Sequence, residues 1–433
     1  MQLDNRKAVF GWTMYDWANS AFATSIMAGL FPFFFREYWR AGLDESNTQI
    51  LLALANSVGS IVVALSAPLL GAIADRGTAK KKFLMFFAFL GVVMTSSLYL
   101  VSKGEWPLAV MLYVLSCIGF CGGNIFYDSL ITGVASEKKM DFVSALGYAL
   151  GYLGGGILFS LNAWMVLRPE TFWFAGRDEA VRFAFLSVGI WWAAFSVPIF
   201  LFVKEPEASQ PVSGLQMVRA GLNQLRGTFH EIRHLKTVFL FLLAYWLYID
   251  GVDTIIRMAI NHAQNLGFRE DVLIPALLIP QFVGFPCAIG FGYLGGRLGT
   301  KRALLIAVAS YLFISLWGAF IQSKADVYVL AVLIGLVQGG IQALSRSFYT
   351  RIIPVNKSAE YFGFYNMLGK FAAVIGPLLL AGVVWLLKSM GYSPDISSRI
   401  GIGSISLMFI AGGILLYFVD EKKGRQEARY LSE

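Results

Sequence analysis

The sequence predicts an all-α membrane protein that crosses the bilayer twelve times, with six spans on each side of a polar linker. Composition is the first observation. Hydrophobic residues make up 57% of the 433 residues and charged residues only 14%, whereas soluble domains carry roughly 25% charged residues. The second is length, because twelve apolar runs reach about the 20 residues that a helix needs to cross a bilayer. The third is that these runs do not alternate polar and apolar residues, which excludes a membrane β-barrel.

We take each run as a helix because lipid offers the backbone no hydrogen-bonding partner. The expected spans, in chain order, are Val9–Phe35, Thr48–Ala74, Phe83–Val101, Pro107–Thr132, Phe142–Leu167, Arg182–Val203, Val238–Met258, Val272–Gly295, Ala303–Ile321, Val327–Ile352, Tyr361–Leu387 and Ile400–Phe418. Within each half, a polar segment with at least one Lys or Arg separates every span from the next. These segments are 36–47, 75–82, 102–106, 133–141 and 168–181, then 259–271, 296–302, 322–326, 353–360 and 388–399.

Basic residues determine the expected orientation. With the amino terminus and alternate loops on one side, that side holds 22 of the 35 Lys and Arg residues, the other side holds 10, and 3 fall within spans. The richer side is cytoplasmic by the positive-inside rule. We therefore expect a multi-pass protein of the cell inner (plasma) membrane with both termini cytoplasmic. The net charge of +8 then reflects topology and contact with membrane lipids. Nucleic-acid binding is excluded because no soluble face carries a basic stripe.

The polar segment Lys204–Thr237 divides the spans six and six, and it contains an amphipathic stretch over Gln216–Lys236. We expect a first domain of six helices over 1–203, a cytoplasmic linker over 204–237, a second domain of six helices over 238–419 and a cytoplasmic tail over 420–433. Transporters are often built from such internal repeats. Two short patterns recur in the halves: Asp16-x-x-Asn19-Ser20 with Asp250-x-x-Asp253-Thr254, and Gly122-Gly123 with Gly339-Gly340.

The turns after spans two and eight carry related motifs. They read Gly71-x-x-x-Asp75-Arg76, and Gly292-x-x-x-Gly296-Arg297-x-Gly299-x-Lys301-Arg302. Both resemble the signature of the major facilitator superfamily, Gly-x-x-x-Asp-Arg-x-Gly-basic-basic, although the second has lost the acid. The resemblance implies the major facilitator fold, which has twelve transmembrane helices in two pseudo-symmetric six-helix bundles around a central cavity. The expected conformational gate is then Gly71, Asp75, Arg76 and Arg297, in which glycine permits the turn and the acid faces a helix amino terminus.

Three further segments extend the resemblance over nearly the whole chain. They are Tyr15-Asp-Trp-Ala-Asn-Ser-Ala-Phe-Ala23, Gln338-Gly-Gly-Ile-Gln-Ala-Leu-Ser-Arg-Ser347 and Tyr361-Phe-Gly-Phe-Tyr-Asn-Met-Leu-Gly-Lys370. They are similar to segments of the "unknown major facilitator" family of bacteria, which is related to the fungal vacuolar effluxers linked to autophagy. The resemblance implies transport of small molecules, with amino acids as the substrate class suggested by the fungal relatives.

Seven ionisable side chains lie within the expected spans away from their ends; Arg182 and Arg351, at span ends, are counted with the loops. An unpaired charge at a helix centre costs about 2.5–3.5 kcal/mol on insertion scales, so these groups must pair with one another or face water. Such residues usually mark a substrate or proton pathway. Amides lie beside them at helical spacing. The expected substrate and coupling-ion residues are Asp16, Asn19, Asn124, Asp128, Asp250, Asp253, Arg257, Gln338, Gln342, Arg346, Asn366 and Lys370.

These observations predict a secondary active transporter that moves a small polar or zwitterionic solute by alternating access. We expect an exported amino acid, because a zwitterion needs one cation and one anion nearby. Protons are the expected coupling ion, with Asp16 and Asp128 as candidates for the proton step; sodium is the alternative. We expect a monomer with no cofactor and no resident metal. A cation-coupled sugar or metabolite importer and a lipid flippase remain alternative functions.

Two other motifs need a separate interpretation. His230-Glu231-x-x-His234 matches the His-Glu-x-x-His zinc signature, so a membrane zinc peptidase is an alternative of another class, although the match is local. Span five is rich in glycine around Gly151 and Gly155. Tyr152 stands where the related antiporter signature has proline, so we interpret these glycines as close helix packing.

Overall fold

The structure is a computed structural model, which describes residues 3–39, 45–205, 214–231, 235–265, 270–371 and 375–430. Over these residues the regular secondary structure is helical, and twelve helical segments are long and apolar enough to cross a membrane. The predicted number and type of spans are therefore confirmed.

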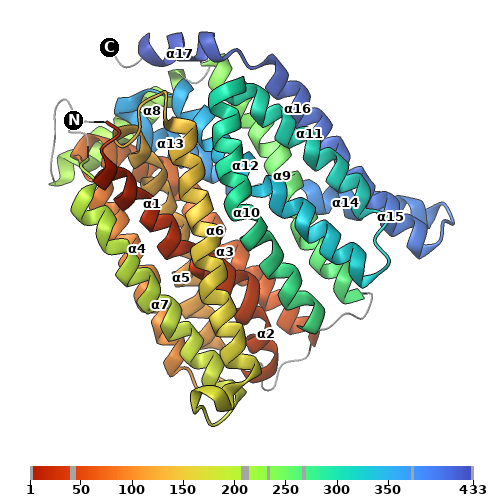
Figure 1. Ribbon diagram of the computed structural model, residues 1–433. Helices are drawn as coiled ribbons and strands as arrows, with labels where there is room; N and C mark the ends of the chain where they lie inside the picture. The colour runs from red at the N-terminus through yellow and green to blue at the C-terminus, as the bar shows by residue number, and fades with distance from the viewer. Residues whose placement is uncertain are drawn as a thin grey trace. The chain divides into compact units, whose positions relative to one another are not determined.

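The helices and their bounds follow the order of the chain (Figure 1). They are α1 (Arg6–Ala21), α2 (Phe31–Phe34), α3 (Glu45–Gly77), α4 (Lys80–Ser97), α5 (Trp106–Leu130), α6 (Met140–Leu167), α7 (Arg177–Phe202), α8 (Gly214–Glu231), α9 (Lys236–Asn265), α10 (Glu270–Leu298), α11 (Thr300–Gly318), α12 (Lys324–Ile352), α13 (Ser358–Phe371), α14 (Ile375–Ser389), α15 (Pro394–Ser404), α16 (Ser406–Phe418) and α17 (Glu421–Tyr430). Two π-helical segments, Phe22–Leu30 and Phe35–Trp39, continue the first span on either side of α2.

Several helices extend beyond the expected spans into charged sequence. For example, α1 begins at Arg6 rather than Val9, where the Asn5 side chain accepts hydrogen bonds from the backbone N–H groups of Lys7 and Ala8. This cap satisfies two amides that the first turn of a helix leaves without partners. Hydropathy detects only the apolar part of a span. It therefore misses the polar first turn of a helix, which a capping side chain stabilises.

The residues form two compact units, each described here by itself. The first comprises Met1–Ser136, Leu150–Leu225 and Lys357–Asn366. Its helix pairs include α1 with α7, α4 with α5 and α7, and α3 with α5. The core of this unit is aromatic: Trp39, Tyr113, Phe185 and Trp192 are all buried.

The second unit comprises Glu137–Ala149, Arg226–Asn356 and Met367–Glu433. In it α12 packs on α9, α10 and α11, while α16 packs on α9 and α11. Each unit thus includes a short segment from the other half of the sequence. These are the first turns of α6 and of α13. The predicted division at the linker, into 1–203, 204–237, 238–419 and 420–433, stays a prediction.

Glycines let α6 approach α1 closely within the first unit. A Cβ added at Gly151 would lie 2.6 Å from Ser20 Oγ, and one at Gly155 would lie 2.8 Å from Thr24 Oγ1. A side chain at either position would force a neighbour to shift, because normal contacts are longer. The interpretation of these glycines as close packing is confirmed.

In the part of the chain that the structure describes, two α-helices lie outside the twelve spans. The amphipathic stretch expected in the linker forms α8, whose Gly221 packs against Ile73 of α3. The predicted tail forms α17, which packs against α12 and α9. The sequence indicates the first of these helices by its amphipathic pattern but not the second, because α17 carries mostly charged residues.

Candidate functional site

Asp16 of α1 lies in the first unit beside aromatic residues of α5. Its side chain is 7% exposed, and the hydroxyl of Tyr127 donates a hydrogen bond of 2.7 Å to Oδ2. The Tyr127 ring stacks on Trp12 with centroids 4.5 Å apart. Stacking fixes the position of the phenol, so Asp16 is a buried carboxylate held by an aligned hydroxyl donor.

Two further polar contacts of the first unit involve residues of α5. Asn19 donates to the Oδ1 atom of Asn124 at 2.6 Å, which joins α1 to α5. At the end of α5, Asp128 accepts a 3.2 Å hydrogen bond from Asn366 of α13. The structure thus brings together five of the predicted residues of this unit in adjacent polar contacts. Each contact satisfies a buried group by hydrogen bonding, as burial requires.

Asp250 lies in the second unit and caps a helix. Its side chain is fully buried and accepts hydrogen bonds from the backbone N–H groups of Ile375 at 2.9 Å and Gly376 at 3.1 Å. Thr254 donates to the same carboxylate at 3.2 Å. A carboxylate at the first amides of α14 also interacts favourably with the helix dipole. Asp250 therefore holds α14 on α9, a structural role that its predicted part in substrate contact did not include.

Asp253 lies near two cations of the predicted set. The positive charges of Arg257, one turn further along α9, and of Lys370 on α13 both act on its carboxylate. Asp253, Arg257 and Lys370 together place charges of both signs on α9 and α13. Along α12, Gln338 and Gln342 are half-buried. These five residues remain predicted substrate contacts.

Arg346 is almost fully buried and is held by α6. Its Nε atom donates to Ser144 Oγ at 3.0 Å, and Nη2 donates to the Ser144 carbonyl at 2.9 Å. The guanidinium lies 4.3 Å from the ring centroid of Tyr148, which is cation–π distance. The predicted role of Arg346 in gating or binding thus acquires a definite partner, the start of α6.

The predicted gate residue Asp75 joins α3 to the first turn of α13. Its carboxylate pairs with Lys80 at 2.8 Å and accepts the backbone N–H groups of Ala359 at 3.1 Å and Glu360 at 2.9 Å. The Lys80 ammonium also donates to Ser358 Oγ at 2.7 Å. We call these five residues the Asp75 cluster. The expectation that this acid faces a helix amino terminus is confirmed.

Glycine is required at position 71 by the same contact. A Cβ added to Gly71 would lie 2.2 Å from the Ala359 carbonyl oxygen. Beside it, the predicted gate residue Arg76 is exposed.

Glu205 accepts hydrogen bonds from the backbone N–H groups of Lys80 and Lys81, at 2.6 and 3.2 Å, and so caps α4. Burial raises the pKa of the Glu205 carboxyl, although these hydrogen bonds oppose the shift.

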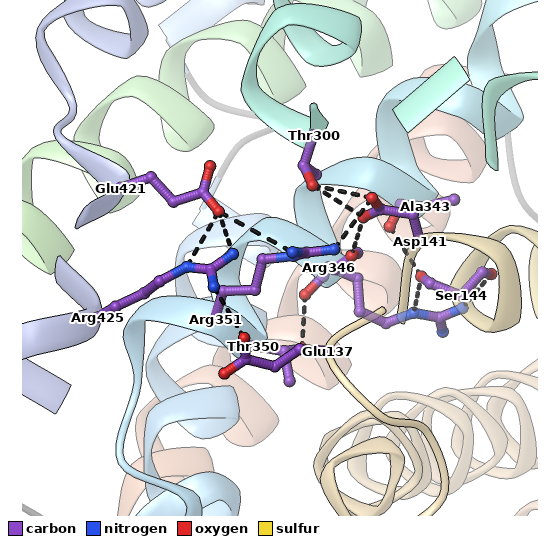
Figure 2. Close-up of polar contacts among 11 residues, drawn as sticks. Glu137, Asp141, Ser144, Thr300, Ala343, Arg346, Thr350, Arg351, Glu421 and Arg425 are labelled. Atoms are coloured by element: carbon purple, nitrogen blue, oxygen red, sulfur yellow. Dashed lines mark hydrogen bonds and ion pairs between the residues drawn. The ribbon is translucent and has the colours of Figure 1, made fainter. Parts of the chain in front are cut away.

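Asp141 is the centre of a corresponding arrangement in the second unit (Figure 2). It is 3% exposed and accepts hydrogen bonds from Thr300 Oγ1 at 3.0 and 2.9 Å and from Ser347. It also forms a 3.0 Å ion pair with Arg351. We call these four residues the Asp141 cluster. It holds the first turn of α6 on α11 and α12.

The second turn motif supplies the glycines of this arrangement but not its acid. A Cβ added at Gly292 would lie 2.6 Å from the Ala145 Cβ, and one at Gly295 would lie 3.1 Å from Asp141. Gly296, in the position of the lost acid, has nothing within 4 Å, and Arg297 is exposed. The acid of this half therefore comes from α6 rather than from the turn after α10.

Four charged residues of these clusters were not among the predicted site residues, because charges near span ends are typical of loops: Asp141, Arg351, Lys80 and Glu360. A signal was present: Arg351 falls inside the expected tenth span, and Asp141 directly precedes the fifth. Glu360 is fully buried, and Gln224 of α8 donates to it at 2.5 Å.

The zinc motif gains no support from the structure. His230 and Glu231 are in the last turn of α8, but their side chains and all of residues 232–234 lie outside the described residues. Over the residues that were described, no group of three or more His, Cys, Asp or Glu side chains could hold a metal ion.

Similarity to known sequences extends over most of the chain. Residues 42–429 match the family described as "Vacuole effluxer Atg22 like". The MFS-type transporter YxiO of Bacillus subtilis is 34% identical over 421 residues, covering 95% of this chain and 94% of that protein. Autophagy-related protein 22 of Yarrowia lipolytica is 24% identical over 445 residues, covering 83% of this chain and 73% of that protein.

Among solved structures, the human organic anion transporter MFSD10 (TETRAN) superposes with a TM-score of 0.70 at 15% identity. The match covers 95% of this chain and 98% of that one. At this identity the likeness concerns the fold alone, and it is the major facilitator fold expected from the turn motifs.

Proposed function

Since this chain belongs to the family of Atg22-like vacuole effluxers, which are transporters of the major facilitator superfamily, we propose that it exports an amino acid by alternating access, coupled to the movement of protons. The family consists of transporters rather than enzymes, so the zinc peptidase alternative is set aside. Members of the superfamily move small molecules across membranes, and the family name supports efflux. The remaining features of the proposal come from this chain's own residues.

The observation that carries proton coupling is the environment of Asp16. The carboxylate is 7% exposed within a membrane span, and its partner Tyr127 is a neutral hydroxyl. Among the other buried acids of the spans, Asp75 pairs with Lys80, Asp250 caps α14 and Asp128 accepts a hydrogen bond from Asn366. A buried carboxylate that shares a hydrogen bond with a hydroxyl group is positioned for proton transfer, as carboxyl groups are in general acid–base chemistry. We assign Asp16 the proton step and Asp128 a supporting position.

The substrate assignment rests on the charges around Asp253. Arg257 and Lys370 lie within electrostatic range of its carboxylate. An amino acid presents a carboxylate and an ammonium group, and such a set offers one partner for each. The amides Gln338 and Gln342 of α12 are the proposed hydrogen-bonding groups for its polar parts.

Alternation needs contacts that close and release the transport path. We propose that the Asp75 and Asp141 clusters are these contacts, because each holds the first turn of one helix against a glycine of another. By the positive-inside rule, both clusters and both termini lie on the cytoplasmic side of the plasma membrane. The protein acts as a monomer in contact with anionic lipids on that side.

The test is solute flux through the purified protein in proteoliposomes, across a panel of radiolabelled amino acids and sugars, with and without a pH gradient. We expect at least one amino acid to move, and we expect the gradient to accelerate it. Asp16→Asn should abolish the acceleration, whereas Glu105→Gln, which removes an exposed carboxylate outside the spans, should not. Flux of a sugar alone with a sodium requirement would support the importer instead. An unchanged pH response in Asp16→Asn would contradict the proton assignment.

A further inference from the structure

The C-terminal helix α17 has a fixed position within the second unit. The Asp420 carboxylate accepts hydrogen bonds from the backbone N–H groups of Lys422 at 2.9 Å and Lys423 at 3.2 Å, which caps the first turn. Just before it, Lys301 of α11 donates to the carbonyl groups of Tyr417 and Val419, both at 2.7 Å. The connection from α16 is therefore held on both sides, and α17 starts in a defined direction.

A small-residue face docks α17 on the ends of two spans. A Cβ added at Gly424 would lie 2.8 Å from Ile352 at the end of α12 and 2.8 Å from Thr237 at the start of α9. One turn later, Ala428 is 6% exposed. Contact this close indicates that the segment predicted as a cytoplasmic tail contains a packed helix.

The same side of α17 carries Glu421 and Arg425, which lie beside Gly424 and Ala428 at helical spacing and continue a chain of ion pairs that begins at Asp141 (Figure 2). Arg351 pairs with Asp141 at 3.0 Å and lies 4.0 Å from Glu421. Glu421 pairs with Arg425 at 2.5 Å, and Arg425 pairs with Glu137 at 2.8 Å. The charges alternate in sign along the whole chain, so no like charges are adjacent in it.

Both ends of this chain lie in one short segment, because Glu137 and Asp141 flank the start of α6. From this closed loop of contacts we propose that α17 is a latch, which holds the first turn of α6 on α12 and so biases the Asp141 cluster toward its closed form. Separation of α6 from α12 breaks the Asp141–Arg351 pair and the Glu137–Arg425 pair together. The assignment rests on the proposed function in one respect, that the Asp141 cluster opens during transport.

The exposure of the Asp141–Arg351 and Glu137–Arg425 pairs indicates how much each contributes to the stability of the closed form. The side chains of Asp141 and Arg351 are 4% and 11% exposed, whereas those of Glu137 and Arg425 are 59% and 29% exposed. Pairs in water contribute little because solvent screens them. The buried pair therefore holds the closed form, and α17 adjusts how often that form opens.

The test measures opening directly in the full-length protein. Ser144→Cys is the reporter, because Ser144 is fully buried at the start of α6. It is introduced after the three native cysteines, Cys117, Cys121 and Cys287, are replaced by alanine, and its rate of reaction with a small maleimide is measured without any solute. Arg425→Gln should raise that rate roughly 1.5-fold to 5-fold, as expected when a partly exposed pair is removed. Lys423→Gln is the matched control, since it removes an exposed cation from the same helix and should leave the rate unchanged.

A second variant separates latching from folding of α17. Glu137→Gln leaves α17 intact and removes its partner on the segment before α6, and it should raise the labelling rate in the same direction. If Arg425→Gln and Glu137→Gln both label at the rate of Lys423→Gln, the latch is refuted. Because labelling needs no transported solute, this result does not depend on the flux test. A protein that moves no amino acid can still show the latch, and an active transporter can lack it.

Discussion

The contact between α3 and α13 gives the sharpest mutational prediction. At Gly71, a Cβ would lie 2.2 Å from the Ala359 carbonyl oxygen, well over 1 Å short of ordinary contact. The atom it meets is backbone, which cannot move aside as a flexible side chain can. Overpacking of this kind costs about 1–3 kcal/mol. If the cost falls on the closed form alone, Gly71→Ala shifts the equilibrium toward opening by roughly 5-fold to 150-fold.

The assay uses Ser358→Cys in the cysteine-free background as a reporter, because Ser358 is fully buried in the Asp75 cluster. Its labelling rate follows the open fraction when opening is rare. Gly296→Ala is the control. It makes the same change in the second turn motif, where an added Cβ meets nothing within 4 Å. Faster labelling in Gly71→Ala and an unchanged rate in Gly296→Ala are expected. Equal rates in the two variants would refute the argument that this contact closes the path.

Three further predictions concern single carboxylates. Asp75→Asn leaves the buried Lys80 ammonium unpaired and should destabilise the detergent-solubilised protein by about 3–5 kcal/mol, with partial recovery when Lys80→Met is added; equal stability of the single and double variants would contradict this. Asp250→Ala should cost about 0.5–2 kcal/mol through loss of the cap on α14. Asp250→Asn should lose part of that stability, because asparagine has one acceptor oxygen for the two backbone N–H groups, but it should keep flux; loss of flux in a stable Asp250→Asn protein would favour substrate contact. Because the folded-state pKa of Glu205 is raised, its ionisation should reduce stability as the pH rises from the usual glutamate range through the raised value. Thermal unfolding of Glu205→Gln should lack this component, and identical pH profiles would contradict it.

The twelve spans could be predicted because each is an apolar run of membrane length, and lipid leaves helices as the only form for such runs. Their ends could not, since capping side chains such as Asn5 set them. The helix α17 was missed for a related reason. Its charged sequence predicts a cytoplasmic tail, and only the packing of Gly424 shows that it docks.

Many residues of the candidate site could be predicted from the sequence, but the residues that they contact could not. Rarity of charge in lipid identified Asp16, Asp250 and Arg346, and Asp75 followed from the turn motif. Spacing along one helix could not reveal that Asp250 caps α14 or that Arg346 is held by the start of α6, since these contacts join residues distant in the chain. The Asp141 cluster shows the same limit, because in this half of the protein the acid lies on a different helix from the glycines.

The central claim is that transport moves protons through Asp16, and its most direct test is the pH inside proteoliposomes that carry a trapped pH-sensitive dye. With no gradient imposed, addition of the transported amino acid should change the internal pH with the parent protein. Asp16→Asn should move the amino acid down its gradient without that change. Equal pH changes in the two proteins, or solute flux in the parent with no pH change, would contradict the account.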